Sequence, residues 1–239
     1  MDLDYGILQG LAMTAHLGYV ASRYTGTARH GRQVVDDHLV QVDDGSYHST
    51  FQDAEVGLHQ TVLRTPFVAT PFVAYLFPVQ AYATRGHAAS GHHLRELRIG
   101  AALARTLRPF LPDAYGQVTY AYNAAERQAD HSIHRHSVDM ELGYFVTPRL
   151  SLKGAASWVR TSGGIDWDRL SPEFRRYVLF HDALANERSW RVGGGAGYAL
   201  TPRYQLYALG FATVSGASTH SMNMFATGIG WNFATPWAH

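Results

Sequence analysis

The chain has 239 residues, of which 46% are hydrophobic and 16% are charged, and its formal net charge is +1. Its lysines and arginines are scattered, which argues against a nucleic-acid partner, because phosphate binding requires a concentrated basic face. The chain has no cysteine, which excludes disulfides, thiolate catalysis and zinc-thiolate sites. It has no continuous run of about 18 apolar residues, which excludes a membrane-spanning helix.

Segments in which apolar and polar residues alternate recur along the chain, and this period of two is typical of β-strands with one apolar face. In residues 136–146, for example, Ser137, Asp139 and Glu141 fall on one face, while Val138 and Met140 fall on the other. The predicted strands cover about residues 11–23, 50–63, 67–81, 94–107, 114–123, 136–146, 150–159, 189–200, 204–214 and 222–233.

One strand-turn-strand unit occurs twice. Residues 142–159 and 197–214 both contain Gly-Tyr, then Thr-Pro-Arg, then Leu at the same relative positions. An array of such hairpins must close on itself or leave open edges. We therefore predict an all-β fold, a single-domain antiparallel up-and-down β-barrel over residues 1–239 with about ten strands. Eight or twelve strands remain open, because residues 67–81 and the first long loop can be divided differently.

The two faces of the strands predict where the barrel resides. A barrel of about ten strands has too little interior for every bulky apolar face, so the apolar residues are expected to point outward into lipid. In residues 94–107 this places Ile99 and Leu103 outward and Arg98 inward. The phase of residues 204–214 stays open, because the repeat turns Leu206 outward whereas the aromatic residues favour Tyr207. Three consecutive glycines at residues 193–195 predict a coil or sharp bend.

Long polar segments alternate with short turns between the predicted strands. The longer loops cover about residues 25–49, 82–93, 124–135, 161–186 and 215–221, and residues 171–184 include a charged piece with helical character. Short turns at one end and longer loops at the other are typical of outer-membrane barrels.

The last predicted strand alternates apolar and small residues and ends at Phe233. It resembles the C-terminal strand of bacterial outer-membrane β-barrels, although residues 234–239 follow the aromatic residue. Residues 143–158, GYFVTPRLSLKGAASW, resemble small porin-like barrels described as transporters of aromatic compounds. The resemblance implies a location in the outer membrane of a Gram-negative bacterium, in contact with lipid. Because residues 1–4 lack the features of an export signal, we expect that such a signal has been removed.

Charged side chains are expected in the interior of the barrel, where an unpaired charge is costly. We predict that they pair there, either as a structural plug or along a path for a solute or ion. His16 is assigned to the same face. The predicted lumen-lining residues are Asp53, Glu55, His59, Glu96, Arg98, Asp139, Glu141, Lys153 and Arg191.

The chain contains 14 histidines, and several of them lie in or beside two neighbouring predicted loops. Imidazole is a common ligand of zinc, nickel and copper, so the two groups form a candidate metal site above the barrel, with solvated loop histidines as the alternative. No cofactor is predicted. The candidate metal ligands are His87, His92, His93, His131, His134 and His136.

The preferred function is a narrow porin-like channel for small solutes or ions. A non-conducting barrel whose outer loops bind a surface partner, such as a protein, is a close alternative. An outer-membrane hydrolase is a third alternative. Its candidate residues are His220 beside Ser221, His136 with Asp139, and His59 with Glu55. Adjacent residues on a strand point to opposite faces, and no nucleophile motif accompanies these residues, so catalysis is less favoured.

Overall fold

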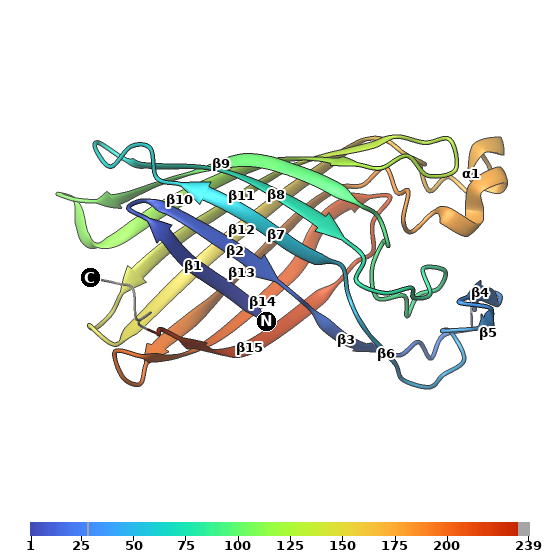
Figure 1. The fold of residues 1–239 in the computed structure, drawn as a ribbon, viewed down its shortest axis with the longest axis horizontal. Coiled ribbons are helices and arrows are strands. Elements are labelled where there is room, and N and C mark those ends of the chain that lie inside the picture. Colours follow the sequence, from blue (N-terminus) through green and yellow to red (C-terminus); the bar gives the residue numbers. More distant parts are fainter. Residues whose placement is uncertain (28, 234–239) are drawn as a thin grey trace.

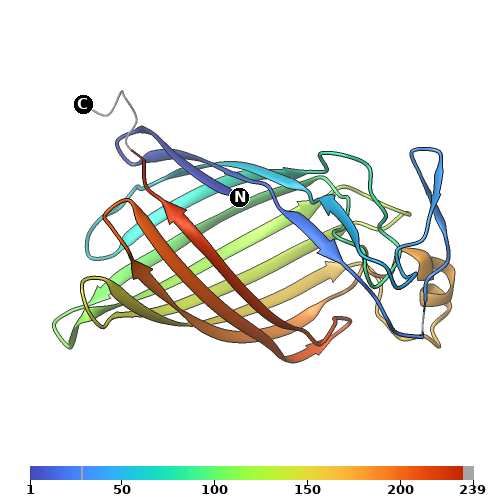
Figure 2. The ribbon, with the colours of Figure 1, turned by 90° about the horizontal axis from the view of Figure 1, so that it is seen from below.

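The computed structural model describes residues 1–27 and 29–233, and these residues form an all-β fold. Eleven strands make one antiparallel sheet in which consecutive members are hydrogen-bonded neighbours. The strands of this sheet are β1 (Asp2–Leu8), β2 (Leu11–His16), β7 (Ala54–Gln60), β8 (Val68–Phe77), β9 (Glu96–Leu107), β10 (Leu111–Ala125), β11 (Ile133–Phe145), β12 (Leu150–Gly163), β13 (Arg188–Ala199), β14 (Tyr204–Ala217) and β15 (Asn223–Trp231). The sheet curls on itself (Figure 1 and Figure 2), and among the described residues no pairing joins its edge strands, β1 and β15.

Smaller elements gather beyond one end of the sheet. The chain leaves β2 into a hairpin of β3 (Tyr19–Ser22) with β6 (His48–Phe51), and between these strands lies a second hairpin, β4 (Gln33–Val35) with β5 (His38–Val40). The helix α1 (Pro172–Tyr177) and the 3-10 turn η1 (Val178–Phe180) lie at the same end, opposite the short turns (Figure 1). The longer connections are therefore grouped together in space.

The N-terminal segment differs from the prediction. Residues 2–8 form a strand that the sequence reading missed, so the sheet has eleven strands rather than about ten. β1 pairs with β2 through a tight turn in which Gly10 has a φ of 79°, a value that glycine adopts readily. The predicted strand over residues 11–23 is divided into β2 and β3, because β2 pairs with β7 while β3 pairs with β6.

One face of the sheet carries exposed apolar side chains, as the alternation predicted. On β9, Leu97, Ile99 and Leu103 are 45–47% exposed, whereas Glu96, which directly precedes Leu97, is buried. The register continues this face across the sheet, since Leu103 lies opposite Val118, which is also exposed. Large apolar residues thus cover one face, and the ion-paired side chains of Glu55, Glu96 and Arg98 lie on the other.

The register also settles the phase of β14. Leu206 pairs with Tyr198 on one side and with Ile229 on the other, and all three are exposed, so Leu206 belongs to the apolar outer face. Tyr207 therefore falls on the opposite, inner face, where its ring packs closely over the backbone of Gly228.

The consecutive glycines of β13 have a packing role rather than the predicted bend. β13 runs through residues 193–195 without interruption. A Cβ atom built on Gly193 would lie 2.7 Å from the ring of Phe211, and one on Gly195 would lie 2.6 Å from the side chain of Leu209. The glycines leave the space that these large inner side chains of β14 occupy.

The charged segment predicted to have helical character contains α1. Its N-cap is Ser171, whose hydroxyl accepts a hydrogen bond from the backbone N–H of Phe174 at 3.0 Å, and Pro172 follows in the first turn. Across residues 1–27 and 29–233, the structure contains no helix with the length and apolar character needed to cross a membrane.

Candidate functional site

Ion pairs connect strands across the inner face of the sheet. The Nη1 atom of Arg98 on β9 lies 3.2 Å from Oε2 of Glu55 on β7, so the pair reaches over the intervening strand β8. Arg135 on β11 reaches in the same way over β10, with its Nη1 2.7 Å from Oε1 of Glu96. These opposite charges form ion pairs on a surface that is partly buried.

A second group of charges lies farther along the sheet. Lys153 donates to Glu141 at 3.0 Å, and Glu141 also accepts the hydroxyl proton of Tyr115 at 2.5 Å. Arg191 pairs with Glu187 at 2.6 Å, a partner that the sequence reading had not named.

The other predicted lumen residues have different surroundings. Asp53 accepts a hydrogen bond from the Tyr82 hydroxyl at 2.7 Å. His59 lies 3.3 Å from Asp4, and His16 lies 2.6 Å from Asp2. Asp139 is half-buried on β11, opposite Thr119 and Ser157. Neither His59 with Glu55 nor His136 with Asp139 forms the acid–base pair considered for a hydrolase, since Glu55 binds Arg98 and His136 binds Tyr120.

Five of the six candidate metal ligands are engaged separately. His134 and His136 hydrogen-bond to the hydroxyls of Tyr122 and Tyr120, at 2.9 and 2.8 Å. The Nδ1 atom of His92 accepts from Arg135 at 3.2 Å. The rings of His93 and His131 pack against Tyr82 and Tyr177, respectively. Among the described residues, these five do not come together as a set of metal ligands.

The sixth, His87, belongs to a different group, which we call the histidine–aspartate cluster. The cluster is assembled from loops that lie far apart in the sequence, at the end of the sheet that carries α1. Its members are His30, Asp43, His87, His181, Asp182 and His220.

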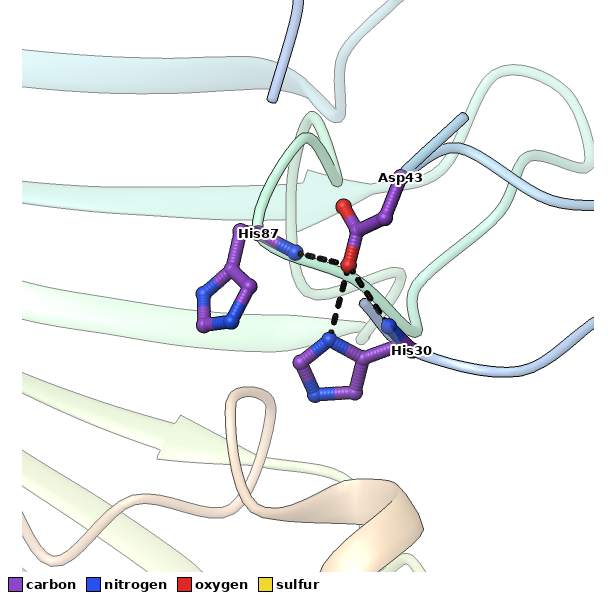
Figure 3. Close-up of side chains that lie close together, drawn as sticks. All are labelled: His30, Asp43 and His87. Atoms are coloured by element: carbon purple, nitrogen blue, oxygen red, sulfur yellow. Dashed lines mark hydrogen bonds and ion pairs between the residues drawn. The ribbon is translucent and has the colours of Figure 1, made fainter. Parts of the chain in front are cut away.

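Asp43 connects two of these loops. Its carboxylate is fully buried and accepts hydrogen bonds from the backbone N–H of His30 at 3.0 Å, of His87 at 3.2 Å and of Ala88 at 3.1 Å. It also binds Nδ1 of His30 at 2.8 Å (Figure 3). Burial acts to raise the pKa of Asp43, but the hydrogen bonds from His30, Ala88 and His87 outweigh it and lower the pKa below its ordinary value. Asp43 is therefore an ionised anchor between these loops.

Two histidines of the cluster, His30 and His181, are held through Nδ1. A carboxylate accepts hydrogen bonds, so Nδ1 of His30 carries the proton that it shares with Asp43. Nδ1 of His181 donates in the same way to the backbone carbonyl of Val178 at 2.5 Å. In a neutral imidazole this arrangement leaves the lone pair on Nε2. Nε2 of each ring is thus left free of these two hydrogen bonds, and the rings stack at 5.3 Å between centroids.

Asp182 lies between two histidines. Its Oδ1 is 3.3 Å from Nε2 of His181 and 3.4 Å from Nε2 of His220. Burial acts to raise the pKa of Asp182, but its hydrogen bond with His220 and the nearby histidines bring the pKa below the ordinary value. The same hydrogen bond raises the pKa of His220, against the effect of burial.

Two sets within the cluster have potential ligand atoms that all lie within 4.8 Å of one another. One is His30, Asp43 and His87, and the other is His30, His181 and Asp182. The sequence reading missed most of these residues because it grouped histidines by their proximity in the chain. The signal that could have found them is the strand alternation itself, which brings all the longer loops to one end of the sheet.

No protein-family model matches this chain, and a search of curated proteins found no significant match.

Proposed function

We propose that this chain is a bacterial outer-membrane β-barrel that forms a narrow channel for small solutes or ions. The observation that carries the proposal is the division of the sheet into an exposed apolar face and an ion-paired polar face. On β9 the two alternate residue by residue, with Leu97 and Ile99 exposed and Glu96 and Arg98 paired to charges on other strands. This pattern is typical of a barrel with lipid outside and a polar interior.

A water-soluble protein is a poorer explanation of the same face. Soluble monomers rarely expose contiguous apolar patches larger than a few hundred Å². Here large exposed side chains recur on strand after strand, including Val56 on β7, Tyr120 on β10, Leu152 on β12 and Trp190 on β13. Lipid covers such a face without a partner protein, and a closed barrel leaves no backbone edge unpaired in the membrane.

Closure of this sheet has a defined geometry. Consecutive strands run in opposite directions, so the first and last of eleven strands run in the same direction. A closed barrel would therefore join β1 to β15 by parallel pairing, whereas bacterial single-chain barrels usually have an even number of strands and close with an antiparallel pair.

Single-channel conductance of the refolded chain in a planar bilayer tests the proposed function. We expect defined, reproducible current steps, and we expect Glu55→Gln to change their size or ion selectivity because it removes an inner charge. Phe110→Ala, in an exposed turn, serves as the control and should leave them unchanged. Silence from protein that is folded and inserted would contradict a channel and favour a barrel that binds a partner through its loops. Turnover of phospholipid in the same membranes would favour the hydrolase.

A further inference from the structure

We propose that His30, His181 and Asp182 form a binding site for a divalent transition-metal ion of the zinc class. The three side chains come from the segment between β3 and β4 and from the segment that follows η1. This inference does not depend on the proposed channel, because it concerns metal binding by the loops alone.

The separation of the ligand atoms supports the assignment. Zinc bound tetrahedrally at about 2.0–2.2 Å places neighbouring nitrogen and oxygen ligands about 3.3–3.6 Å apart. His181 Nε2 and Asp182 Oδ1 are 3.3 Å apart, which matches this edge.

The hydrogen bonds of the two histidines also fit those of metal ligands. Histidines that bind metals usually donate their other ring N–H to a carboxylate or a backbone carbonyl, which fixes the tautomer and the ring orientation. His30 donates Nδ1–H to the buried carboxylate of Asp43, and His181 donates Nδ1–H to the carbonyl of Val178. In Figure 3 the second ring nitrogen of His30 points away from Asp43.

The other set, containing His30, Asp43 and His87, is a weaker candidate. The Asp43 carboxylate already accepts hydrogen bonds from three backbone N–H groups and from His30, so its lone pairs are occupied. The ring of His87 stacks on Tyr24 at 4.3 Å between centroids. We therefore assign Asp43 to orienting His30 rather than to binding the metal itself.

Asp182 has a supporting partner as well. His220 reaches its Oδ1 from β14–β15 connecting residues, at 3.4 Å. The side chains of His30, His181 and Asp182 are 13–20% exposed, so they are partly preorganised by packing yet remain accessible to an ion. Two imidazoles and one carboxylate with an open fourth position suit zinc, and imidazole also accepts nickel and copper.

Isothermal titration of the folded, full-length chain in detergent with ZnCl₂, without a histidine tag, tests the site. We expect saturable binding of one zinc ion per chain to this site. When Co²⁺ is bound instead, we expect a visible absorption spectrum that indicates a low coordination number of the ion. His181→Ala and Asp182→Asn should each weaken zinc binding at least about tenfold. Asp182→Asn preserves the size of the side chain, so it remains informative if His181→Ala disturbs the fold.

His134→Ala is the matched control, because His134 is bonded to Tyr122 on the strand side and lies outside the proposed site. It should retain the zinc affinity of the unaltered chain. Binding that does not saturate would overturn the proposal. The proposal would also be overturned if His181→Ala or Asp182→Asn, folded as judged by circular dichroism, bound zinc with an affinity within about threefold of the unaltered chain. An equally large loss of zinc affinity in His134→Ala would overturn it as well.

Discussion

Arg98 on β9 contacts Glu55 on β7 across the whole width of β8, with 3.2 Å between Nη1 of the arginine and Oε2 of the glutamate. The arginine also lies over the ring of Phe72 on β8, at 5.5 Å from its centroid. Three consecutive strands are therefore connected by one side chain. Both partners are about one-quarter exposed, so the pair is only partly screened by water.

Removing one partner of this pair should destabilise the protein. We expect Arg98→Ala to lower the free energy of unfolding by about 1–3 kcal/mol, because Glu55 loses its partner and Phe72 its cation contact. A double-mutant cycle with Glu55→Gln, measured by urea unfolding in lipid vesicles, should show a coupling of at least about 0.5 kcal/mol. Arg149→Ala, in an exposed turn, is the control. Additive effects of the two substitutions would show that the residues are not coupled.

The outer face gives a second prediction. Ile99→Arg places a charge on the exposed apolar face and should destabilise folding into lipid by about 2–4 kcal/mol if Ile99 lies near the bilayer midplane. Phe110→Arg, at a 90% exposed position in the turn after β9, should have little effect. Folding yields and unfolding curves in vesicles measure both. Equal stability of the two variants would contradict contact between this face and lipid.

The glycines of β13 allow a matched pair of substitutions. In Gly193→Ala the new methyl would lie 2.1 Å from the carbonyl oxygen of Gly210 and 2.7 Å from the ring of Phe211, so we expect a loss of about 1–3 kcal/mol. At Gly154 on β12, nothing lies within 4 Å of the corresponding position. Gly154→Ala should be neutral or stabilise by about 0.4–1 kcal/mol. Thermal unfolding distinguishes the two, and similar destabilisation by both would argue against the packing described for Phe211.

Asp43 should be important for the order of the loops. Asp43→Asn keeps the size of the side chain but replaces one of its two acceptor oxygens with a donor. Oδ2 accepts from the backbone N–H groups of His30 and His87, and Oδ1 accepts from that of Ala88, so hydrogen bonds are lost at one oxygen or the other. Hydrogen–deuterium exchange of residues 85–90 should become faster, and zinc affinity should fall about 10–100-fold.

The adjacent carboxylate provides the control for this substitution. Asp44 accepts hydrogen bonds from Ser46 and lies 2.8 Å from His48, all on the outside of the cluster. Asp44→Asn should leave exchange of residues 85–90 unchanged. If both variants exchanged equally fast, the assignment of Asp43 as the anchor would be wrong.

Closure of the sheet can be tested by cross-linking, because the chain contains no cysteine of its own. Tyr5→Cys on β1 would be combined in turn with Phe225→Cys, Thr227→Cys and Ile229→Cys on β15. If lipid-inserted protein is a closed barrel with parallel β1 and β15, one of these pairs should form a disulfide under oxidising conditions. The electrophoretic shift of the cross-linked chain measures it. If none of the three cysteine pairs formed a disulfide, the result would argue against a barrel closed by pairing of β1 with β15 at these positions.

The sequence alone determined the direction of each side chain along most strands. Leu97, Ile99 and Leu103 had to share one face and Glu96 and Arg98 the other, because the period of a strand is two regardless of its neighbours. The alternation of short turns and longer loops between successive strands placed the longer loops at one end of the sheet. The alternation did not decide which residue of β14 points outward, because Leu206 and Tyr207 are both large. The pairing of Leu206 with Tyr198 and Ile229 placed Leu206 on the outer face.

The partners of side chains were decided by the tertiary structure. Arg98 meets Glu55, and His30 meets His181, through the curvature of the sheet and the paths of the loops, which no local spacing encodes. His87 illustrates the limit, since it lies close in sequence to His92 and His93 but joins His30 and Asp43 instead. A period of two fixes orientation within a strand, whereas long-range contacts depend on how every strand and loop packs together.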